Sequence, residues 1–157
     1  GLSCEIQSFR HAVNMLGYDK LNRWLSLLLG TASKDPMAPA LMHTALFRAR
    51  LMELLASGLV DKSEYDNLFI TGAFSLLDAL LGVGIEQVLD AMRLPEPISD
   101  ALLGNGGRYQ AFLELALASE KNDGQMIAEQ AAMLGLTAAQ FNRAQMQALS
   151  FADAMEF

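Results

Sequence analysis

Few side chains in this sequence have the types and spacing that chemistry requires, and they fall into two stretches. His43, Arg48 and Arg50 lie close together in the first stretch, and Ser75 and Asp78 lie in the second. An imidazole and a carboxylate can both bind a divalent metal ion, but a protein metal site needs three or four ligands. The chain has only two histidines. We therefore predict no metal site, no cofactor and no catalytic residue among these five.

Asp78 is the most informative carboxylate. Leucines stand at positions 76, 77, 80 and 81 around it, which predicts that it is buried. A buried carboxylate must be paired or hydrogen-bonded, or else take up a proton. We expect Arg48 or Arg50 to be its partner, and the alternative hypothesis is an acid or metal ligand. His43 is interpreted in the same way, as a structural histidine with a hydrogen-bond partner rather than a ligand.

Composition excludes several classes of protein. Hydrophobic residues make up 52% of the 157 residues and charged residues 18%, as in an ordinary globular domain. A net charge of −7 with dispersed Lys and Arg argues against nucleic-acid binding. No apolar run approaches the ~18 residues of a membrane span, and we expect no signal peptide. The single cysteine, Cys4, cannot form an internal disulfide, so we expect a cytoplasmic protein.

The helices that must position these residues are indicated by caps and stops along the chain. Hydrophobic spacing of three and four residues recurs throughout, and no segment shows sustained alternation with β-branched residues. Asp35-Pro36 is a strong start signal for one helix, and Thr137 with Gln140 for another. We predict an all-α bundle without a sheet, folded as one domain over residues 1–157. The first predicted helix ends at residue 16. The others span about 19–32, 36–57, 61–82, 85–92, 98–103, 109–121, 125–134 and 137 to the C-terminus.

The segment 61–82 is predicted to be one continuous helix in the centre of the bundle. A capping-type start at Asp61 precedes it, and apolar residues then occur nearly all round its circumference. The acidic cluster at 120–123 is interpreted as the end of another helix and its solvated loop. Methionine at helical spacing is interpreted as core filling; this prediction covers Met15, Met52, Met92 and Met133.

Nearly the whole chain resembles the HDOD domain, a relative of the metal-dependent HD phosphohydrolases. Ser75-Leu76 stands where an HD enzyme would carry its His-Asp metal doublet. The version it is most similar to is the C-terminal part of bacterial EAL–HDOD signalling proteins. The segments that carry the resemblance are 11–17, 21–28, 46–55, 72–82 and 113–118.

The resemblance implies a function as well as a fold. It implies an HD-related helical domain without the metal site, in which His43 is the relic of a metal-binding position. Such a domain acts as a non-catalytic signal transduction output through protein–protein or interdomain contacts, here in a cyclic di-GMP-linked pathway. The alternative hypothesis is a degenerate HD-type phosphohydrolase, or a nucleotide-binding domain, that uses His43 and Asp78.

The resemblance also implies partners. The chain is expected to be the C-terminal portion of an HDOD domain, without the domain's N-terminal helices and without an EAL domain. The expected partner is another protein or an upstream EAL domain of the same chain. A homodimer is a further expectation, formed by the first two helices through the apolar face of Ile6, Phe9, Val13 and Leu16.

Overall fold

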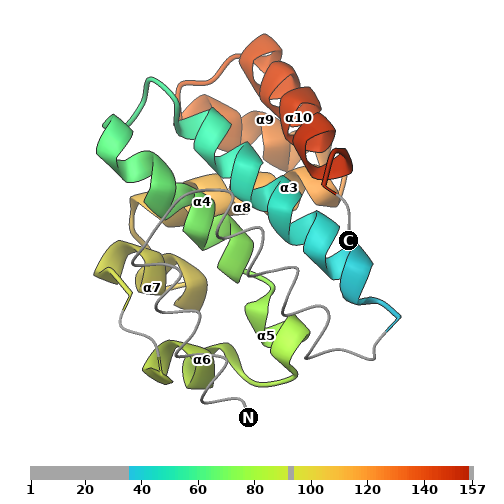
Figure 1. Ribbon diagram of the computed structural model, residues 1–157. Helices are drawn as coiled ribbons and strands as arrows, with labels where there is room; N and C mark the ends of the chain where they lie inside the picture. Colours follow the sequence, from blue (N-terminus) through green and yellow to red (C-terminus); the bar gives the residue numbers. More distant parts are fainter. Residues whose placement is uncertain (1–35, 92–93, 156–157) are drawn as a thin grey trace.

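A computed structural model describes residues 36–91 and 94–155, which fold as a bundle of α-helices (Figure 1). Within these residues there is one isolated bridge, between Ser57 and Val60, and no sheet, so the all-α prediction is confirmed. Predictions for residues 1–35, including the face of Ile6 and Phe9, lie outside the described residues, as does Met92. The helices are α3 (Ala38–Ala56), α4 (Tyr65–Phe74), α5 (Leu77–Leu81), α6 (Ile85–Ala91), α7 (Glu96–Leu103), α8 (Arg108–Glu120), α9 (Gly124–Met133) and α10 (Ala138–Asp153).

Helix α3 is the central element of the bundle, and it packs against α4, α8 and α10 (Figure 1). Its side chains Met42, Leu46 and Met52 are almost completely buried. The helix begins at Ala38 rather than at Pro36 as predicted, because Pro39, and not Pro36, occupies its first turn. Either proline suits a helix start, since neither N–H would have an intrahelical acceptor there.

The crossing of α3 and α4 is unusually close at Gly72. A Cβ atom at this position would lie 2.5 Å from the Cα atom of Ala49 and 2.6 Å from its nitrogen. Gly72 and Ala49 are both buried, so the two helix backbones meet here without an intervening side chain. This contact fixes the position of the end of α4, and with it the position of Ser75.

The C-terminal helices follow the predicted caps closely. Thr137 and Gln140 form a reciprocal capping box at the start of α10, as predicted. Asp123 accepts a hydrogen bond from the backbone N–H of Met126 at 3.1 Å and caps α9. As predicted, α8 ends at Glu120 and residues 121–123 are exposed to solvent; Asp123 and Glu120 also have structural partners.

Two further predictions are settled by the fold. Met52 lies in the core as expected, but Met133 is 79% exposed, so core filling was the wrong interpretation for this residue. Helix α7 begins at Glu96, two residues before the predicted start, because Pro97 fits its first turn. Among the described helices, none has the length and apolar character needed to cross a lipid bilayer.

Candidate functional site at the break between α4 and α5

The predicted helix over 61–82 is interrupted at Ser75-Leu76. Asp61 starts a short 3-10 turn, Lys62–Glu64, and α4 then runs only to Phe74 before α5 begins at Leu77. The Ser75 hydroxyl donates a hydrogen bond to the carbonyl oxygen of Gly72 at 2.6 Å. Side-chain bonding of this kind competes with the helical ladder, and Leu76 takes φ −117° and ψ 9°, outside the helical range. The prediction of one continuous helix was therefore wrong.

Arg48 of α3 faces this break and connects it to α8. Its Nη1 atom donates to the Ser75 hydroxyl at 3.1 Å, while Nε and Nη2 donate to the two carboxylate oxygens of Glu120 at 2.5 and 2.7 Å. The Arg48 side chain is 11% exposed and that of Glu120 is 24% exposed. A two-point contact between guanidinium and carboxylate is among the strongest polar contacts in proteins. Three helices are thus held together by one half-buried cation.

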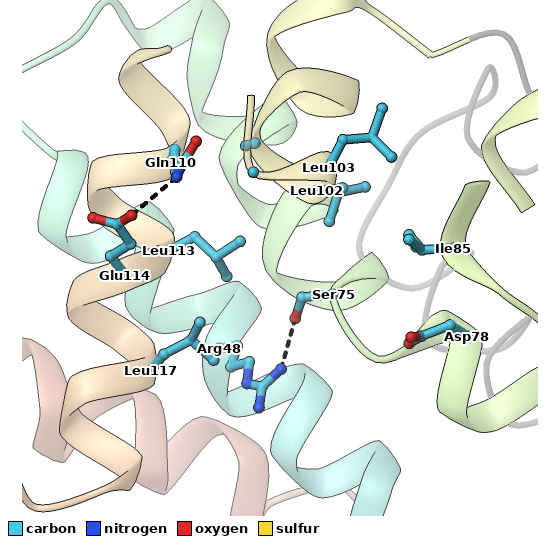
Figure 2. Close-up of a pocket in the computed structure, with 12 residues that line it drawn as sticks. Arg48, Ser75, Asp78, Ile85, Leu102, Leu103, Gln110, Leu113, Glu114 and Leu117 are labelled. Carbon is cyan, nitrogen blue, oxygen red and sulfur yellow. Dashed lines mark hydrogen bonds between the residues drawn. The ribbon is translucent and has the colours of Figure 1, made fainter. Parts of the chain in front are cut away.

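Asp78 lies near this contact but outside it. It lines a cavity of about 420 Å³ together with Arg48, Ser75 and residues of α7 and α8 (Figure 2). Arg48 binds Glu120 instead, Arg50 binds Glu53, and Asp78 itself is only half-buried. The predicted Asp78–arginine pair was therefore wrong. The reason is that the guanidinium of Arg48 points toward α8, where both carboxylate oxygens of Glu120 accept its hydrogen bonds.

Replacing Asp78 by Ala is expected to change the free energy of unfolding by less than about 1 kcal/mol, because a half-exposed carboxylate loses little when it is removed. Urea denaturation followed by circular dichroism measures this. A loss of about 3 kcal/mol or more would mean that Asp78 has a buried ionic partner after all.

His43 has a structural partner at a different place in the fold. Its Nε2 atom lies 2.6 Å from the Oδ1 atom of Asp153, which joins the first part of α3 to the last turn of α10. The side chains of His43 and Asp153 are 38% and 63% exposed. His43 does not line the cavity that contains Ser75 and Asp78. Within the described residues, no three His, Cys, Asp or Glu side chains gather closely enough to hold a metal ion.

Arg50 and Glu53 form a second ion pair on α3, with Arg50 Nη1 and Glu53 Oε2 2.8 Å apart. The Arg50 guanidinium also lies over the Phe151 ring, 5.6 Å from its centre. Burial, and then the negative charge of Asp66, raise the pKa of Glu53 to about 7. Burial also lowers the pKa of Arg50. Sequence analysis did not identify Glu53, although its place among apolar residues of a central helix could have indicated burial.

The raised pKa of Glu53 predicts a dependence of stability on pH. The folded chain binds a proton at Glu53 more tightly than the unfolded chain does, so the free energy of unfolding falls as the pH rises from about 5 through 7. At pH 5 the neutral Glu53 resembles glutamine. When the pH is raised from 5 to 8, the free energy of unfolding of Glu53→Gln should therefore increase relative to that of the wild type by about 1–3 kcal/mol. Urea titrations of both proteins at the two pH values measure the gain, and a difference that does not vary with pH would contradict it.

Comparison with known proteins gives two relatives. The chain is 33% identical over 134 residues to a protein of Vibrio cholerae named cyclic di-GMP phosphodiesterase CdgJ, with 85% of this chain covered. It is 32% identical over 129 residues to YuxH of Bacillus subtilis, whose function is uncharacterised, with 78% of this chain covered. No family model matches the chain, and no solved structure matches it. The alignments cover 31% and 30% of these relatives. The chain is therefore homologous to about a third of two longer bacterial proteins.

Proposed function

We propose that this chain is an HDOD-type output region of a cyclic di-GMP-linked signalling protein, and that it acts through contacts with protein rather than through catalysis. The proposal is supported by the name of CdgJ, a cyclic di-GMP phosphodiesterase to which most of this chain aligns. It is also supported by the all-helical fold and by Ser75-Leu76 at the position where HD enzymes hold their metal.

The observation that carries the non-catalytic part is the guanidinium of Arg48 at the Ser75 hydroxyl. Arginine keeps its positive charge at every physiological pH. A divalent cation at Ser75 would lie close to this fixed charge and would be repelled by it. The carboxylate that compensates the charge of Arg48 is that of Glu120, which binds Arg48 with both of its oxygens. This arrangement favours a site used to hold three helices together.

A degenerate phosphohydrolase or nucleotide-binding domain is the second candidate, and the cavity at Ser75 favours it. Asp78 and Glu114 both line the cavity, and its volume of about 420 Å³ is within the range of small-molecule sites. Glu114 accepts a hydrogen bond from Gln110 at 2.9 Å, which leaves it able to accept another. His43, the other residue this hypothesis requires, lies elsewhere.

The two candidates are separated by measuring hydrolysis with the 157-residue chain. Cyclic di-GMP and an activated phosphodiester should be incubated with Mn²⁺ or Mg²⁺, and Mn²⁺ binding should be followed by calorimetry. We expect no turnover above the metal-only control and no saturable binding. Metal-dependent turnover that Asp78→Asn abolishes would support the second candidate and overturn the first.

The proposed interdomain contact can be tested with the remaining part of the parent protein. If the gene encodes an upstream EAL domain, that domain should be purified alone and assayed for cyclic di-GMP hydrolysis with and without this chain added in trans. We expect the added chain to change the rate saturably. An unchanged rate, together with no detectable binding between the two parts, would contradict an interdomain role.

A further inference from the structure

We draw no further inference here: the strongest candidate, the largely apolar groove between α9 and α10 together with the exposed side chains of Met146 and Leu149 on α10, carries none because nothing in the structure shows what covers it.

Discussion

Replacing Gly72 by Ala is expected to destabilise the protein by about 3 kcal/mol or more. In an ordinary helix this substitution stabilises by up to about 1 kcal/mol, because alanine has the better helix propensity. Here the new methyl group would lie 2.5 Å from the Cα atom of Ala49 and 2.7 Å from the carbonyl carbon of Arg48. Both are backbone atoms, so no side chain can rotate away and the two helices must separate. Overpacking of a core that cannot relax in this way is strongly destabilising.

The measurement is a urea or thermal unfolding curve, and the sign of the change is informative in itself. A loss of about 3 kcal/mol corresponds to a fall in Tm of roughly 6–12 °C for a chain of this size. Gly124→Ala is the matched control, because no atom lies within 4 Å of a Cβ atom at Gly124. This variant should be within about 0.5 kcal/mol of the wild type. A stabilised Gly72→Ala variant would show that α3 and α4 do not approach as closely as described.

Local signals in the sequence predicted most of the helix ends. The capping box at Thr137 acts over three residues, and the cap at Asp61 acts over two. Such signals depend only on neighbours in the chain, and they can be recognised without knowledge of the fold. The predicted fold class was correct for the same reason.

The break at Ser75-Leu76 could not be predicted in this way. The apolar pattern of 61–82 continues through it, and hydrophobic periodicity alone favours one helix. What ends α4 is the bonding of the Ser75 hydroxyl to the Gly72 carbonyl, together with Arg48 of another helix. Serine within a helix often points to solvent instead, so the residue type does not decide between the two outcomes.

The site residues were identified correctly in part, but their pairing was not. Arg48, Ser75 and Asp78 do share one cavity. The carboxylate that binds Arg48 is 72 residues away in the sequence, and nothing in the sequence distinguishes Glu120 from the other acidic residues near a helix end. His43 likewise meets Asp153, 110 residues away. Ion pairs between distant segments depend on the packing of whole helices, which the pattern of single residues does not give.

Replacing Glu120 by Ala is expected to destabilise the protein by about 2–4 kcal/mol. The side chain of Arg48 is 11% exposed, and its guanidinium would lose both of its carboxylate bonds, keeping only the Ser75 hydroxyl. Removing one partner of a buried ion pair costs about 3–5 kcal/mol, and the partial exposure of Glu120 reduces this somewhat. Glu114→Ala on the same helix is the control, because Glu114 binds the neutral Gln110, and it should cost less than about 1.5 kcal/mol.

The variant Arg48→Leu/Glu120→Leu should be more stable than the sum of its single variants predicts, because neither charge is then left without the other. If the two single effects simply add, or if Asp78→Ala proves more damaging than Glu120→Ala, the contact between Arg48 and Glu120 does not hold α3, α4 and α8 together.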